Sequence, residues 1–129
     1  MSEAAQRNKR NRRAGARWQS DLRDGLRDAG FDVERLALTG GQDEGDHVVR
    51  LNPADMPVRR FVVIEAKAGV LHPAEFARQA GIEAAHFAFH RGLSLAEVTG
   101  IAVVKRRNAN WRDAYVLTTV RDYFGLEVG

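Results

Sequence analysis

The chain has 129 residues, of which 44% are hydrophobic, and this size and composition fit one domain with an apolar core. It contains no cysteine, which excludes disulfides, thiolate metal sites and a cysteine nucleophile and fits a reducing compartment. Its apolar runs are shorter than the roughly 20 residues that cross a bilayer, and no apolar segment follows the basic N-terminus. We therefore expect an intracellular, cytoplasmic protein that does not enter membranes.

Positive charge is concentrated at the N-terminus. The net charge is +3, and the first 17 residues hold six basic residues against one acid, which leaves −2 for the rest. The basic residues are Arg7, Lys9, Arg10, Arg12, Arg13 and Arg17. Arginine at this density before a folded domain favours contact with nucleic acid, and a solubilising tail is the alternative. Because residues 1–13 lack apolar anchors, we predict a flexible arm there, followed by a single domain at 14–129.

The periodicity of apolar residues predicts the order of the elements. From about Ala14 they recur every three to four positions, which predicts a helix that ends at Gly30. Strands are expected at 31–38, 46–51 and 59–68, where β-branched and aromatic residues gather. A second helix begins near Pro73 and ends before Gly92. Strands at 101–104 and 114–120 and a short helix at 121–126 complete an α/β chain.

Chemically useful side chains stand at the end of the strand at 59–68. Glu65 and Lys67 are two residues apart, so they project from the same face of a strand. The strand at 46–51 is expected to form a hairpin with it, which would bring Asp46 near Glu65. Two carboxylates, with the Ala66 carbonyl as a third oxygen, suit magnesium, which takes its other ligands from water and phosphate. Lys67 would then stabilise charge on a phosphodiester, or position or deprotonate the attacking water.

These residues resemble a known nuclease family. Asp46, eighteen intervening residues and then Glu65-Ala66-Lys67 resemble the core motif of the PD-(D/E)XK nucleases, and Gln79 on the next helix extends the resemblance. It covers roughly residues 14–90 and is closest to the archaeal and phage Holliday junction resolvases. The resemblance implies a mixed central sheet of about five strands flanked by helices, a homodimer, and a prokaryotic or phage host. It also implies cleavage of branched DNA such as a four-way junction, with Mg²⁺ as cofactor and Mn²⁺ as a substitute.

The resemblance assigns roles to the four motif residues. It makes Asp46 and Glu65 metal ligands that also serve catalysis, and Lys67 the catalytic lysine. Gln79 becomes a residue that holds Lys67 or a phosphate.

Three further positions complete the comparison with the resolvases. Arg35 and Thr39 fall where those enzymes have a basic residue and a hydroxyl near the DNA backbone. Gln19 stands where they carry a glutamate on the first helix, so the role of this helix in metal binding departs from the pattern. Gln19 favours one alternative, an inactive DNA-binding module of the same fold. Another alternative is a restriction-type or repair-type endonuclease that acts on linear duplex.

Other polar residues have plainer interpretations. Asp43 and Glu44 are interpreted as loop charges, with the alternative that a metal site near Asp46 takes one of them as a ligand. His86 and His90 lie four residues apart on the second helix, a spacing that can bind zinc, but we expect a histidine pair at the edge of the core. Trp18 is expected in the core.

Overall fold

The computed structural model describes residues 2–37, 44–51 and 60–126. Within these ranges the elements follow in the predicted order of helix, three strands, helix, two strands and short helix. They are α1 (Glu3–Asp28), β1 (Asp32–Arg35), β2 (His47–Arg50), β3 (Phe61–Lys67), α2 (Pro73–His90), β4 (Val98–Val104), β5 (Tyr115–Leu117) and α3 (Val120–Phe124). Two short 3₁₀ turns, Leu95–Glu97 and Trp111–Asp113, were not predicted.

The five strands form one mixed sheet in the order β1-β2-β3-β4-β5. β3 and β4 are parallel, and α2 lies in the connection between them, while the other neighbouring pairs are antiparallel. The predicted hairpin of β2 and β3 is confirmed, with His47 opposite Ile64. The chain is therefore an α/β protein with a mixed five-stranded sheet and helices against it.

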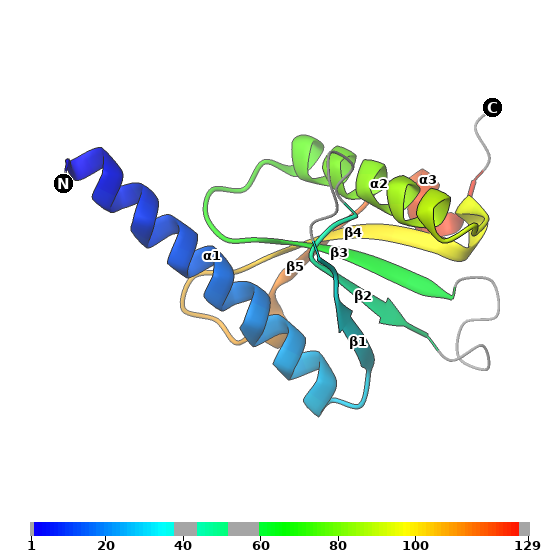
Figure 1. The fold of residues 1–129 in the computed structure, drawn as a ribbon, viewed down its shortest axis with the longest axis horizontal. Coiled ribbons are helices and arrows are strands. Elements are labelled where there is room, and N and C mark those ends of the chain that lie inside the picture. Colours follow the sequence, from blue (N-terminus) through cyan, green and yellow to red (C-terminus); the bar gives the residue numbers. More distant parts are fainter. Residues whose placement is uncertain (1, 38–43, 52–59, 127–129) are drawn as a thin grey trace.

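Helices cover both faces of the sheet, with α1 on one face and α2 on the other (Figure 1). Each helix buries its own apolar cluster, because alternate strand residues point to opposite faces. The cluster under α1 contains Trp18, Leu22, Val33, Val49, Ile64 and Val103. The cluster under α2 contains Leu36, Val48, Phe61, Val63, Ala84, Phe87, Ala88 and Val98. As predicted, Trp18 lies in the core, where its Nε1 donates to the Val103 carbonyl oxygen at 3.2 Å.

The first helix begins much earlier than predicted. It starts at Glu3, where the Ser2 hydroxyl accepts a hydrogen bond from the Ala5 amide at 3.1 Å, and its N-terminal half extends beyond the sheet (Figure 1). The predicted boundary at Ala14 is wrong, because alanine, glutamine, lysine and arginine are strong helix formers. A helix already anchored by Trp18 can also propagate through them without a new nucleus. The basic arm is thus the exposed half of α1.

Three strands also differ from the prediction. β1 covers only Asp32–Arg35 and β5 only Tyr115–Leu117, whereas β4 begins three residues early, at Val98. Thr99 and Gly100 resemble a turn in the sequence, yet both continue the parallel pairing with β3. Gly100 is required there because a Cβ would overlap the backbone of Ala80 in α2. Among the described helices, none has both the length and the apolar character needed to cross a membrane.

Candidate active site at the end of β3

Glu65 and Lys67 lie on the same face of β3, as their spacing predicts. Lys67 Nζ is 3.3 Å from Glu65 Oε1, and the ammonium also lies over the Phe76 ring at 5.3 Å from its centroid. Both side chains face α2, which carries Phe76 on its first turns. The pair is largely buried, with 24% of the lysine side chain and 10% of the glutamate side chain exposed.

Asp46 lies just before β2 and is bonded to β3 around Glu65. The register pairs His47 with Ile64, so Asp46 stands one residue beyond the ladder, opposite Glu65. Its amide donates to the Ile64 carbonyl oxygen at 2.9 Å, and its Oδ2 accepts from the Ala66 amide at 2.8 Å. The hairpin therefore brings the Asp46 carboxylate to the backbone amide of Ala66, the residue between Glu65 and Lys67.

Gln79 connects the strand to α2. Its Nε2 donates to Glu65 Oε1 at 3.4 Å and to Glu83 Oε1 at 3.0 Å. The predicted role of Gln79 was to hold Lys67 or a phosphate, but its hydrogen bonds go to two carboxylates instead. One of these carboxylates is the ion-pair partner of Lys67. Gln79 thus orients Glu65 directly, and it affects Lys67 only through Glu65.

Glu83 is a site residue that the sequence reasoning missed. It is 3% exposed and lies one helical turn after Gln79 on the buried face of α2. The signal was present, because the apolar stripe of Phe76, Ala80, Ala84 and Phe87 includes position 83. An acid within such a stripe is rarely buried without a partner.

The two glutamates make an electrostatically unusual pair. Burial, followed by the hydrogen bond and the charge of Glu83, raises the pKa of Glu65 to about 8, and Lys67 only partly opposes this. Glu65 Oε2 is buried and has no hydrogen-bond partner among the described residues. A site with excess carboxylate and an unsatisfied buried oxygen is suited to a cation.

A cavity of about 490 Å³ lies on the α1 side of Asp46. Asp46, Gly45, Gln19 and Arg35 are among its lining residues. The amide of Gln19 is thus close to where the resolvase resemblance expects a carboxylate. The Gln19 carbonyl accepts from His47 Nε2 at 2.9 Å, which ties α1 to β2, and burial lowers the pKa of His47.

The predicted DNA-binding residues are distributed over two regions. Arg35 is exposed at the end of β1 and lines the cavity beside Asp46. Thr39 lies outside the described residues. The six basic residues of the arm are all exposed along α1, away from the buried glutamates.

Glu44 lies in the loop before β2, as predicted, but it is buried and paired there, whereas Asp43 lies outside the described residues. The residue Glu44 is 7% exposed, and its Oε2 accepts from His90 Nδ1 at 2.9 Å. His86 and His90 stack with their ring centroids 6.4 Å apart. Glu44 and His90 are 46 positions apart in the sequence, so only the packing of α2 against the segment before β2 brings them together.

The donor set around Ala66 has the chemistry of a hard-cation site. Asp46 and Glu65 could supply carboxylate oxygens, with the Ala66 carbonyl as a neutral ligand. In the described part of the chain, no three His, Cys, Asp or Glu side chains gather into a metal-binding group. An ion held here would therefore take its remaining ligands from backbone, water and substrate phosphate, as magnesium commonly does.

Comparison with known proteins adds no relative to these observations. No protein-family model, no curated protein and no solved structure matches the chain. The function is therefore argued from the residues of the site.

Proposed function

We propose that this protein is a metal-dependent DNA endonuclease that hydrolyses phosphodiester bonds, with branched DNA such as a four-way junction as its substrate. One observation carries the proposal. The hydrogen bond from the Ala66 amide to Asp46 Oδ2 brings a second carboxylate to the peptide between Glu65 and Lys67. Asp46, Glu65 and Lys67 thus lie around Ala66, and two acids and a lysine are the residues that the nuclease motif requires.

The residues at this position fit a divalent cation. Glu65 Oε2 is buried without a hydrogen-bond partner in the described residues, and the neighbouring Glu83 adds negative charge. Asp46, Glu65 and the Ala66 carbonyl would hold Mg²⁺ or Mn²⁺. The bound ion would supply Lewis-acid polarisation of a phosphate oxygen. Gln79 keeps Glu65 Oε1 in place through its amide hydrogens.

Lys67 has the position expected of a group that acts on phosphate. Its ammonium contacts Glu65 Oε1 on one side and the Phe76 ring on the other, and these contacts restrict its rotamers. A pre-oriented cation stabilises the charge that develops on phosphate oxygens during attack. The same ammonium can orient the attacking water by hydrogen bonding.

The exposed half of α1 supports DNA as the substrate. It carries six basic side chains in solvent on one continuous helix that leads back to Gln19 and the Asp46 cavity. Lysine and arginine side chains that neutralise phosphates supply most of the sequence-independent affinity for DNA. Arg35 adds a positive charge at the rim of that cavity.

A cleavage panel tests the proposal. Purified protein is incubated with Mg²⁺ or Mn²⁺ and a four-way junction, a flap, a linear duplex or a single strand. We expect cleavage of branched DNA, loss of cleavage in Glu65→Ala and Lys67→Ala, and retained binding in gel shifts. Glu34→Ala and Arg121→Ala are matched controls, because they remove exposed charges on other elements, β1 and α3. Cleavage by both site variants at the wild-type rate would overturn the assignment.

One observation favours a second candidate, a DNA-binding module without activity. Gln19 lines the Asp46 cavity with a neutral amide, which binds a divalent cation more weakly than a carboxylate does. Tight junction binding in Mg²⁺ and in Mn²⁺ without a single nick would decide for this candidate. Gln19→Glu would then be expected to strengthen metal binding.

A further inference from the structure

The helix α1 carries a charged stripe that changes sign at its middle. Its members recur every three or four residues, so they lie along one side of the helix. The first half of the stripe is basic and the second half is acidic. The stripe consists of Arg10, Arg13, Arg17, Asp21, Asp24 and Asp28.

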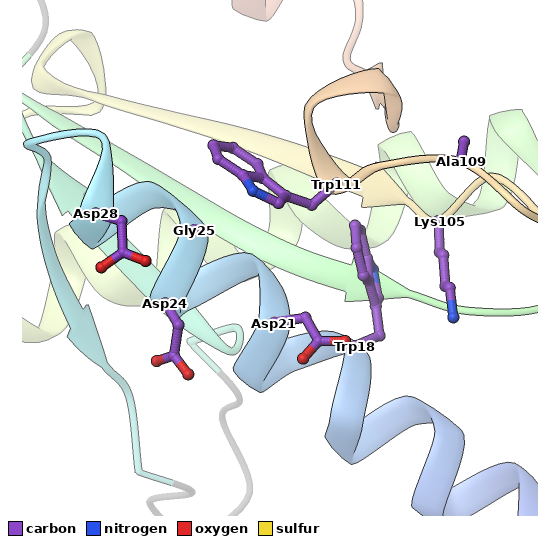
Figure 2. Close-up of a pocket in the computed structure, with 8 residues that line it drawn as sticks. All are labelled: Trp18, Asp21, Asp24, Gly25, Asp28, Lys105, Ala109 and Trp111. Carbon is purple, nitrogen blue, oxygen red and sulfur yellow. The ribbon is translucent and has the colours of Figure 1, made fainter.

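All six side chains of the stripe are exposed. Among the described residues, one ion pair involves a member of the stripe. Arg23 Nε lies 3.3 Å from Asp24 Oδ1, and 63% of the Asp24 side chain is still exposed. The acidic half borders a groove of about 420 Å³ that Trp111 and Lys105 also line. Figure 2 shows the three aspartates on successive turns of α1 and Lys105 extending from the segment after β4.

The basic half of the stripe lies on a stretch of helix with little packing of its own. Buried α1 residues occur only from Trp18 onward, and the helix before them extends past the sheet (Figure 1). Arginines three or four residues apart on one helix repel each other. This half of α1 would therefore be stabilised by a surface of negative charge.

Two copies of the stripe have complementary charges when they lie antiparallel. If two copies of α1 lie antiparallel with the two-fold axis at the height of residue 19 along the helix, Arg10 faces Asp28 of the second copy and Arg17 faces Asp21. Arg13 falls within one residue of Asp24. The same contacts then form twice, as an isologous interface requires. The basic end of each helix also meets the negative dipole end of its partner.

We propose that this stripe is an interface on which a second copy of the chain docks with its α1 antiparallel. The inference is drawn from the charge pattern and the exposure of α1, so it stands whether or not the protein cleaves DNA. DNA is the other candidate occupant of the basic half, but phosphates would be repelled by the acidic half. Lys9 and Arg12 lie on other sides of the helix, so they stay available to DNA in the dimer.

Charge reversal provides the test, with the oligomeric state measured by sedimentation. One variant carries Arg10→Glu, Arg13→Glu and Arg17→Glu, and a second carries Asp21→Lys, Asp24→Lys and Asp28→Lys. We expect a wild-type dimer at about 50 mM salt that dissociates at about 500 mM, because added salt screens exposed charges. Each variant alone should self-associate at least about tenfold more weakly, since its stripe has a single sign. Mixing the two should restore a dimer.

Two further chains separate folding and DNA effects from docking. A chain with both sets of changes has a reversed but again self-complementary stripe, so it should dimerise, and circular dichroism reports whether each variant is folded. The double variant Lys9→Glu and Arg12→Glu should keep the dimer while binding DNA more weakly. The proposal is overturned if the wild type is a monomer at low salt. It is equally overturned if the folded mixture and the doubly reversed chain stay monomeric, or if the aspartate variant keeps the wild-type dimer.

Discussion

The buried carboxyl of Glu65 makes the stability of this protein depend on pH in a definite direction. Its pKa is about 8 in the folded protein, against an ordinary value of 4.5. Between these values the folded chain keeps a proton that the unfolded chain has released, so stability falls as the pH rises. For one such group, linkage gives a loss of roughly 3–4 kcal/mol between pH 5 and pH 8.

Glu65→Gln removes this penalty, because an amide does not ionise. Without divalent cations, we expect the variant to be about 3 kcal/mol more stable than the wild type at pH 8 and close to it at pH 5. Urea unfolding at both pH values in the presence of a chelator measures the difference. The control Glu34→Gln changes a half-exposed carboxylate on β1 and should shift stability by less than about 0.5 kcal/mol at either pH.

A divalent cation should reduce this difference at pH 8. Binding to the folded state alone stabilises it, so Mg²⁺ should raise the unfolding free energy of the wild type more than that of Glu65→Gln. If the wild type and Glu65→Gln differ in stability by the same amount at pH 5 and pH 8, Glu65 is not held protonated. The account of its burial against Glu83 would then be wrong.

Three other predictions concern the site, the packing of α1 and the arm. Gln79→Ala removes the amide shared by two buried carboxylates, so cleavage at limiting Mg²⁺ should fall about tenfold or more, whereas Arg78→Ala on the exposed side should not change it. Gly25→Ala places a methyl group against the Trp111 ring, so it should cost about 1–3 kcal/mol in urea unfolding, and an unchanged midpoint would contradict this packing. If Arg7, Lys9, Arg12 and Arg35 neutralise about four phosphates per subunit, log affinity for DNA should fall with log salt at a slope near −3.6, and Arg12→Ala should lower its magnitude by about 0.9. A slope near zero would exclude phosphate contacts by the arm.

Local sequence patterns were sufficient to predict most of the fold. The run of β-branched and aromatic residues in 59–68 indicated β3, and the period near 3.6 in 73–90 indicated α2. The end of β4 was predictable from its valines, but its beginning was not. Gly100 is needed in this strand because the backbone of Ala80 in α2 lies where a Cβ would be, and a contact across 20 positions leaves no local mark in the sequence.

The candidate site was predictable where residues are neighbours in the chain and not where packing joins distant segments. Glu65 and Lys67 share a face because of strand geometry alone. Glu83 and the Glu44–His90 pair depend on how α2 lies over the sheet. A stronger rule would be to treat any acid within an apolar helical stripe as a candidate for a buried site.

The unbroken course of α1 has a consequence for where a DNA strand would be cut. Arg7 and Gln19 lie on one straight helix, about 18 Å apart at 1.5 Å per residue, and Trp18 fixes this rod to β4 through the Val103 carbonyl. This length corresponds to about five base pairs along a duplex. The scissile phosphate would then lie at a constant distance from the phosphates that the arm contacts. Removing one helical turn before Gly15 would shorten that distance by one or two nucleotides.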